Sequence, residues 1–225
     1  MSDHHDHDHG HDHHDHRHPP GQKHPFQPDV DDTLTYPRRM EIALRELLIE
    51  KGILTADEIR TAVEDMDSRS PARGAQVVAR AWIDPAFKRS LLTDANAACE
   101  SLGLDLGISD LKLVAVENTP DVHNVVVCTL CSCYPRALLG LPPAWYKSFA
   151  YRSRVVNEPR TVLAEFGTEL PDSTAVRVHD STADLRYLVV PMRPKNTEGM
   201  SETELADLVT RDSMIGVAPA RHPSA

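Results

Sequence analysis

The hydrophobic positions of the chain follow a helical spacing in its first half. Apolar side chains recur three and four residues apart from Arg38 onward, which predicts a helix that stops near Gly52. Asp84 followed by a proline predicts the start of another helix, which runs to about Leu102 and ends at the following glycine. Residues 38–103 are therefore expected to form a helical N-terminal segment.

Two capping boxes mark further helix starts. Thr55 stands three residues before Glu58, and Ser201 stands three residues before Glu204. In this spacing each side chain accepts a hydrogen bond from the other residue's backbone amide, which satisfies amides that a helix start leaves unpaired. The second of these helices is expected to run to about Arg211.

The second half of the chain has the short, β-branched runs that are typical of strands. The predicted strands are residues 111–116, 123–127, 174–179, 186–192 and 214–218. A stretch from Tyr134 to Phe166, interrupted by prolines, is predicted to be helical. The pattern predicts an α+β chain: a helical N-terminal arm, then a layered α–β domain over residues 104–220 and a tail at 221–225.

Residues 1–24 are of low complexity and hold ten of the thirteen histidines, interleaved with aspartate. Such a segment cannot bury apolar surface, so residues 1–37, which end in a proline-rich linker, are expected to be disordered. Imidazole and carboxylate groups bind divalent first-row metals, and a native metal-scavenging arm is the favoured interpretation. A purification tag and a plain solubilising tail are the alternatives.

Composition narrows the possible partners. The 225 residues carry a formal net charge of −10, which argues against nucleic acid and gives no attraction to an anionic membrane. No stretch has the roughly 18 apolar residues that cross a bilayer. The N-terminus lacks the basic and apolar regions of a secretory signal, so a cytoplasmic protein is expected.

The cysteines are unevenly placed. Cys99 stands alone within a predicted helix, whereas Cys128, Cys131 and Cys133 fall within six residues, directly after the predicted strand 123–127. A secreted disulfide framework spreads its cysteines, so this cluster indicates metal or redox chemistry. Thiolates select thiophilic transition metals.

Two ordinary explanations of the cluster fit less well. A structural zinc site needs four protein ligands, and Cys99 is the only spare thiol. A thioredoxin-like redox pair needs a βαβ context and uses two cysteines. In the remaining arrangement, the backbone nitrogens of Ser132 and Cys133 join three sulfur atoms around one strongly Lewis-acidic ion. Five ligands would leave the sixth position open for water or substrate, as a catalytic metal requires.

The segment VCTLCSCYP resembles the metal-binding signature of nitrile hydratase α subunits, and the likeness covers roughly residues 38–220. Further matching segments are VENTPDVHNVV, LGLPPAWYKS, YRSRVV and LVTRDSMIGVAPA. The resemblance implies one low-spin Co(III) or, less expected, Fe(III) per subunit, and Thr129 matches the cobalt type. It also implies that Cys131 is oxidised to a sulfinate and Cys133 to a sulfenate, while Cys128 stays a thiolate. Cys131, Ser132 and Cys133 would then be catalytic.

The resemblance also implies partner groups around the metal. Three sulfur anions and two deprotonated amides against a trivalent ion leave negative charge that a buried site must offset. In the family, a β-type subunit supplies arginines to the oxidised sulfurs, so a hetero-oligomer is expected. By motif, His123, Asp180 and Arg186 would orient the metal loop from outside, and Arg136 would face the substrate.

Arg136 leaves two substrates open. Similar cobalt nitrile hydratases commonly have tryptophan there, which suits hydration of an apolar nitrile to its amide. The γ subunit of thiocyanate hydrolase has the arginine, and also shares the His/Asp-rich N-terminus and the segment LAEFG. We expect a nitrile hydratase, with thiocyanate hydrolysis to carbonyl sulfide and ammonia as the alternative. A non-catalytic metal carrier or structural metal module is the second alternative.

Overall fold

The computed structural model describes residues 35–106, 111–131 and 133–223. The chain divides into two compact units, residues 1–53 and 54–225. The predicted arm over residues 1–37 lies almost wholly outside the described residues. The predicted boundary between a helical segment ending at residue 103 and an α–β domain beginning at residue 104 stays a prediction.

The first unit contains the helix α1 (Tyr36–Glu50), which confirms the helix predicted from Arg38. A proline in its first turn suits the helix start, where its missing N–H is not needed. Within its own unit α1 buries none of its residues, and the side chains of Met40 and Leu44 are exposed.

The second unit begins with α2 (Ala56–Ser68). Its predicted capping box is present, because the Thr55 hydroxyl accepts from the Glu58 amide at 3.1 Å and the Glu58 carboxylate accepts from the Thr55 amide at 2.8 Å. The helix α3 (Pro71–Ile83) follows and is among the most buried of the chain. None of the helices among the described residues has the length and apolar character needed to span a membrane.

The single helix predicted from Asp84 to Leu102 is wrong. The structure has two helices there, α4 (Pro85–Thr93) and α5 (Ala95–Ser101). Asp94 separates them in an extended conformation, and its carboxylate accepts from the amide of Ala97 at 3.1 Å. A short acidic side chain that caps a new helix competes with continuation of the old one.

Four strands form two parallel pairs. β1 (Lys112–Glu117) pairs with β4 (Leu185–Val190), and β2 (Val122–Val127) pairs with β3 (Ala175–Asp180). These confirm four of the predicted strands within one or two residues at each end. Parallel neighbours need a long connection, and here helical segments supply it.

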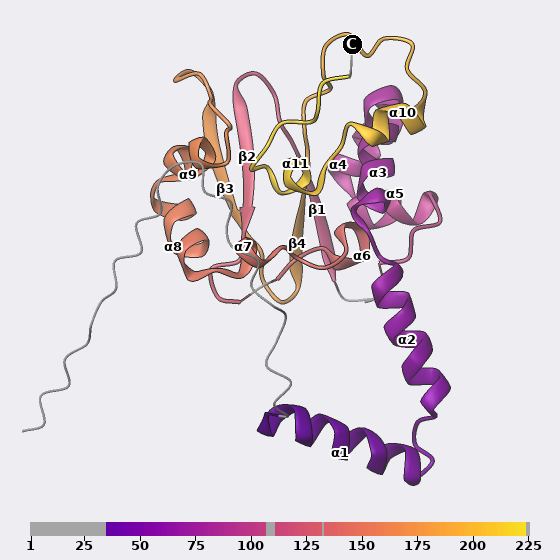
Figure 1. Cartoon of the computed structure of the whole chain (residues 1–225). Coiled ribbons are helices and arrows are strands. Elements are labelled where there is room, and N and C mark those ends of the chain that lie inside the picture. The colour runs from indigo at the N-terminus through magenta and orange to yellow at the C-terminus, as the bar shows by residue number, and fades with distance from the viewer. Residues whose placement is uncertain (1–34, 107–110, 132, 224–225) are drawn as a thin grey trace, which may run out of the picture. The chain divides into compact units, whose positions relative to one another are not determined.

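The strands form the middle of the unit, with helices on either side (Figure 1). α4 and α5 pack on β1, and α3 packs on α4. The predicted helical stretch Tyr134–Phe166 is confirmed as four short helices, of which the last packs on β3. They are α6 (Arg136–Leu139), α7 (Ala144–Lys147), α8 (Phe149–Asn157) and α9 (Pro159–Glu165).

Two expectations near the C-terminus are wrong. The helix from the second capping box, α10 (Glu202–Asp207), ends before Arg211, and residues 214–218 are no strand. A new helix, α11 (Arg211–Ile215), begins where Thr210 caps it, and it ends at Gly216, whose φ is 90°. A short apolar run fits a buried helix as well as a strand, and the cap decides between them.

Candidate metal centre

The three clustered cysteines follow β2 without an intervening turn. Cys128 comes directly after Val127, the last residue of the strand, and is buried, whereas Cys131 is exposed. The Sγ atoms of Cys128 and Cys131 lie 3.4 Å apart, and those of Cys131 and Cys133 lie 3.1 Å apart. All three sulfur atoms fall within 4.8 Å of one another. We name residues 128–133 the cysteine loop.

These separations fit one metal ion. With metal–sulfur bonds of about 2.3 Å, sulfurs at right angles lie about 3.3 Å apart and sulfurs at tetrahedral corners about 3.8 Å apart. The two measured separations are nearer the first value. In the described part of the chain, no fourth cysteine, histidine or carboxylate joins the group. The arrangement therefore does not favour a closed tetrahedral zinc site.

The first peptide of the loop is fixed by Asp180, the last residue of β3. The Thr129 amide donates to Oδ1 of Asp180 at 2.9 Å, and the Thr129 hydroxyl donates to Oδ2 at 2.6 Å. In the ladder Val127 lies opposite Asp180, so parallel register brings this carboxylate to the start of the loop. Hydrogen bonds to charged acceptors are stronger than those to neutral ones, so these two hydrogen bonds restrict the conformation of the first residues of the loop.

Two further side chains hold the carbonyls of the loop. Arg152 of α8 donates from Nη1 to the carbonyl oxygen of Cys131 at 3.1 Å and approaches that of Thr129 at 3.4 Å. The Tyr146 hydroxyl, in α7, donates to the carbonyl oxygen of Cys133 at 2.9 Å. Sequence reasoning missed both roles, although both residues lie in the matching segments LGLPPAWYKS and YRSRVV.

A pocket of about 390 Å³ opens beside the sulfurs of Cys131 and Cys133. Three arginines line it: Arg69, Arg136 and Arg186. Its other lining residues are apolar or aromatic, and no carboxylate stands among the described residues of its wall. We name it the arginine pocket. It brings together two predicted residues, Arg136 and Arg186, and one that was missed, Arg69.

The surroundings of the cysteine loop favour the neutral form of the Cys133 thiol. Burial, and after it the neighbouring Cys131, raises the pKa of the Cys133 thiol to about 12, although the Arg186 guanidinium acts in the opposite direction. A bound metal ion would reverse this balance, because coordination deprotonates a thiol outright. The Nε atom of Arg186 is buried and has no hydrogen-bond partner within the described residues.

His123 lies away from the cysteine loop. It stands near the start of β2, about 16 Å from the loop by strand rise. Its Nε2 donates to the carbonyl oxygen of Gly216 at 2.7 Å, and its Nδ1 accepts from Asn118 at 3.3 Å. The structure thus brings Asp180, Arg136 and Arg186 near the sulfurs, but not His123, whose influence on the loop stays a prediction. Ser132 lies outside the described residues.

Cys99 belongs to the core. It is fully buried in α5, and burial raises the pKa of its thiol to about 12. It does not join the sulfur group. This placement agrees with the expectation that Cys99 is a small core residue, not a fourth metal ligand.

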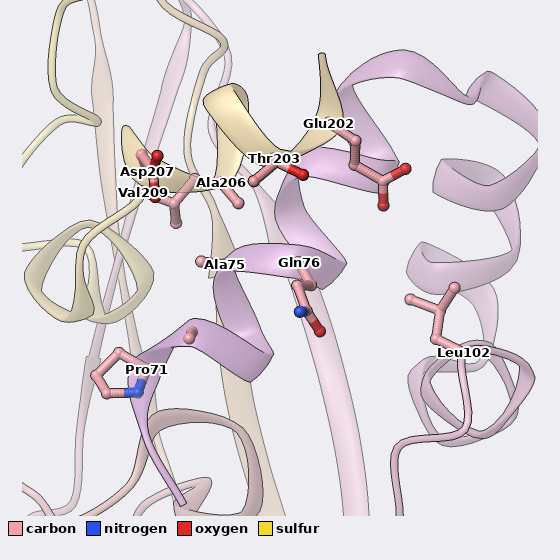
Figure 2. A pocket seen from close by; sticks show the side chains of 10 residues that line it. Pro71, Ala75, Gln76, Leu102, Glu202, Thr203, Ala206, Asp207 and Val209 are labelled. Carbon is pink, nitrogen blue, oxygen red and sulfur yellow. The ribbon is translucent and has the colours of Figure 1, made fainter.

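A larger cavity lies elsewhere, between α3 and α10 (Figure 2). It has a volume of about 630 Å³, and its wall carries alanines beside polar groups such as Gln76 and Glu202. The Glu202 carboxylate is already paired with Arg80 at 2.8 Å. No cysteine stands among its lining residues, so this cavity is separate from the sulfur group.

Fold and site together define a protein class: an α+β chain with three converging cysteine sulfurs, a group that could hold a metal ion, on a loop after a strand. The family model described as nitrile hydratase, alpha chain, matches residues 35–218. The chain therefore belongs to the nitrile hydratase alpha chain family, as the sequence resemblance predicted.

Individual relatives agree. The cobalt-containing nitrile hydratase subunit alpha of Pseudonocardia thermophila is 53% identical, over 80% of this chain and 88% of that protein. The thiocyanate hydrolase subunit gamma of Thiobacillus thioparus is 43% identical, over 80% of this chain and 78% of that protein.

Solved structures are similar as well, and they confirm the α+β fold. A recombinant thiocyanate hydrolase comprising partially modified cobalt centres has a TM-score of 0.78 and 41% identity, covering 83% of this chain and 91% of that chain. A double mutant of the Fe-type nitrile hydratase from Comamonas testosteroni Ni1 has a TM-score of 0.77 and 42% identity, covering 86% and 94%.

Proposed function

We propose that this chain is the metal-binding catalytic subunit of a nitrile hydratase that hydrates a nitrile to its amide. The observation that carries the proposal is the convergence of three sulfur atoms on one loop beside an open pocket. The ligands would be the sulfurs of Cys128, Cys131 and Cys133 with the backbone nitrogens of Ser132 and Cys133. The ion would be low-spin Co(III), since a relative 53% identical is named cobalt-containing, although an Fe-type structure is also similar.

The metal, when bound, supplies Lewis acidity that polarises the nitrile or acidifies water. Cys131 as a sulfinate and Cys133 as a sulfenate would be the oxidised states. The sulfenate oxygen of Cys133 would be the nucleophile, or the base that removes a proton from water. With the sulfenate as base, water adds its oxygen to the nitrile carbon and a proton to the nitrogen. With the sulfenate as nucleophile, its oxygen would bond to the carbon, and water would then restore the sulfenate as the S–O bond breaks. Either route consumes one water and gives an imidic acid, which rearranges to the amide.

We propose a β-type partner subunit as well. Two large apolar side chains near the cysteine loop are exposed, Leu130 at 86% and Phe149 at 84%. Apolar groups of this size beside a catalytic loop suit coverage by another protein. The partner would also supply arginines to the oxidised sulfurs, whose negative charge needs offsetting. Because the thiols must load metal in the reduced state, we place the complex in the cytoplasm.

Thiocyanate hydrolysis is the second candidate, and the arginine pocket favours it. Three guanidinium groups line the pocket; Arg69 is paired with Asp65, and the charges of Arg136 and Arg186 suit a small anion better than a neutral nitrile. Thiocyanate and two water molecules would give carbonyl sulfide, ammonia and hydroxide. The thiocyanate hydrolase relative supports this candidate, whereas the higher identity to the cobalt nitrile hydratase supports the first.

One set of measurements separates these functions. The purified cobalt complex is assayed against a neutral nitrile and against thiocyanate, and its cobalt content and intact mass are determined. An enzyme should hold one tight cobalt per chain and about 48 Da of added mass from three oxygen atoms. A metal carrier would instead show unmodified cysteines and several weakly held ions.

Cys131→Ala tests the centre itself. The variant should lose both cobalt and turnover, because one of three sulfur ligands is removed. Cys99→Ala is the matched control, since that thiol lies in the core outside the group. Full turnover in the Cys131→Ala complex would contradict the proposed function.

A further inference from the structure

Within the residues that the structure describes, the hydrogen bonds from Arg152 to the cysteine loop go to backbone oxygens. Its Nη1 donates to the carbonyl of Cys131 at 3.1 Å and lies 3.4 Å from that of Thr129. These two carbonyls flank Leu130, so one guanidinium spans the turn between the first two cysteines. One nitrogen that donates to two acceptors restricts their separation more than a hydrogen bond to a single acceptor does.

Arg152 is itself fixed in place. Its guanidinium lies over the Phe149 ring, 4.6 Å from the centroid, an arrangement in which a cation is attracted by the ring face. Their helix, α8, is anchored to the strand that enters the loop, because the Tyr151 hydroxyl donates to the carbonyl of Val126 at 2.7 Å. The cysteine loop and Arg152 are therefore both held in place by the contact between α8 and β2.

Arg152 also brings an uncompensated charge. In the part of the chain that the structure describes, its guanidinium is paired with no carboxylate. The nearby Arg154 differs, since it is paired with Glu158 and Glu165 at 2.6 Å each. Positive charge at the loop would favour the thiolate forms that three sulfurs packed within 4.8 Å take when they bind a metal ion.

We propose that Arg152 is a positioning residue that keeps the three sulfurs converged before a metal arrives and so sets the affinity of the loop for thiophilic ions. The inference rests on the proposed function only in assuming that the cysteine loop is a metal site. It adds a residue of this chain itself to the charges that a partner subunit would supply.

The test is a titration of the reduced full-length chain with Cd²⁺, in competition with a chelator. Cadmium–thiolate absorption in the ultraviolet reports sulfur-bound ions, so ions on the His/Asp-rich residues 1–24 stay silent. Arg152→Gln should weaken Cd²⁺ binding by roughly 10–100-fold, the usual cost of losing a group that orients metal ligands. Arg152→Lys keeps the charge without the planar geometry and should be intermediate.

Arg154→Gln is the matched control on the same helix, and it should bind Cd²⁺ as the natural chain does. Equal affinity of the Arg152→Gln and natural chains would overturn the inference, as would equal weakening by the Arg152 and Arg154 changes. Nitrile and thiocyanate turnover are measured separately on the cobalt complex. A complex inactive on both substrates contradicts the proposed function, while weaker Cd²⁺ binding by Arg152→Gln still supports the inference.

Discussion

Thr129 donates two hydrogen bonds to a single carboxylate, that of Asp180, from its amide at 2.9 Å and its hydroxyl at 2.6 Å. The two residues are 51 positions apart in sequence, and the pairing of β2 with β3 brings them together. The threonine that suggested cobalt therefore has a visible structural role, because its hydroxyl helps to fix the loop to the sheet.

This pair gives the first prediction. Thr129→Ser should retain cobalt, Thr129→Val should lose it faster to a chelator, and Asp180→Ala should lose it faster still. The reason is that valine removes one of the two hydrogen bonds and alanine removes both. Loss of such orienting groups costs roughly 10–100-fold in metal affinity.

The measurement is the rate at which the purified complex releases cobalt to a chelator. A double-mutant cycle between Thr129→Val and Asp180→Ala should show a coupling energy, since the residues are in direct contact. Additive effects of the two changes would mean that the contact does not hold the loop.

The second prediction concerns Arg136, which lines the arginine pocket. Arg136→Trp should reduce kcat/KM for thiocyanate far more than for a neutral nitrile, because tryptophan removes a cation and adds apolar surface. Arg136→Lys keeps the charge and is the control. Steady-state kinetics with both substrates decide the matter, and equal losses for the two would remove Arg136 as a determinant of specificity.

The third prediction is a pH dependence of stability. Asn118 Oδ1 accepts from the backbone amide of Asn124 at 2.7 Å, which turns its Nδ2 toward Nδ1 of His123. That nitrogen must then be an acceptor, while Nε2 donates to Gly216, so the imidazole is neutral. Burial is the main cause that lowers the pKa of His123, in agreement with this network.

Because the folded pKa lies below the unfolded value of about 6.5, the unfolded chain binds more protons as the pH falls. This contribution to stability is complete above about pH 6.5 and is lost as the pH falls toward the folded pKa. Urea denaturation between about pH 5 and pH 8 should therefore show a smaller pH slope for His123→Gln than for the natural chain. Identical slopes would show that His123 is not held neutral.

The fourth prediction concerns Gly216. A Cβ atom there would lie 2.0 Å from the carbonyl oxygen of Asn124, a backbone atom that cannot move aside cheaply. Gly216→Ala should lower the free energy of unfolding by at least about 2 kcal/mol, from overpacking together with the positive φ. Gly199→Ala is the control, because its φ of 83° is similar and nothing lies within 4 Å.

Denaturant titration of both glycine variants gives the comparison. The free energy of unfolding of the Gly199→Ala control should fall by only roughly 1 kcal/mol, the cost of placing alanine at a positive φ. Similar losses for the two variants would show that the contact with Asn124 relaxes.

Local sequence signals were sufficient to predict many of the helix starts and strands of this molecule. Both capping boxes form as predicted, because each depends on two residues three positions apart. The break at Asp94 was missed although its cap is equally local. The strand predicted at residues 214–218 was wrong, because a continuous apolar run does not distinguish a strand from a buried helix. The cap at Thr210 shows that a helix begins there.

The residues of the candidate site also fall into those that the sequence predicts and those that depend on tertiary packing. The convergence of the three sulfurs was predictable from their spacing, since three cysteines within six residues can meet in one tight loop. The roles of Tyr146 and Arg152 were not, because their contacts depend on how α7 and α8 lie against the loop. Arg69 is a similar case, because its place in the pocket depends on where α2 ends.

The in-register ladder of β2 and β3 has an evolutionary consequence. Val127 and Asp180 are directly paired, and each is the last residue of its strand. Adding or deleting one residue within β3 would turn the carboxylate to the opposite face, even with every cysteine intact. Natural lineages that keep this chemistry should therefore tolerate changes of length in the connections between these strands, but not inside them.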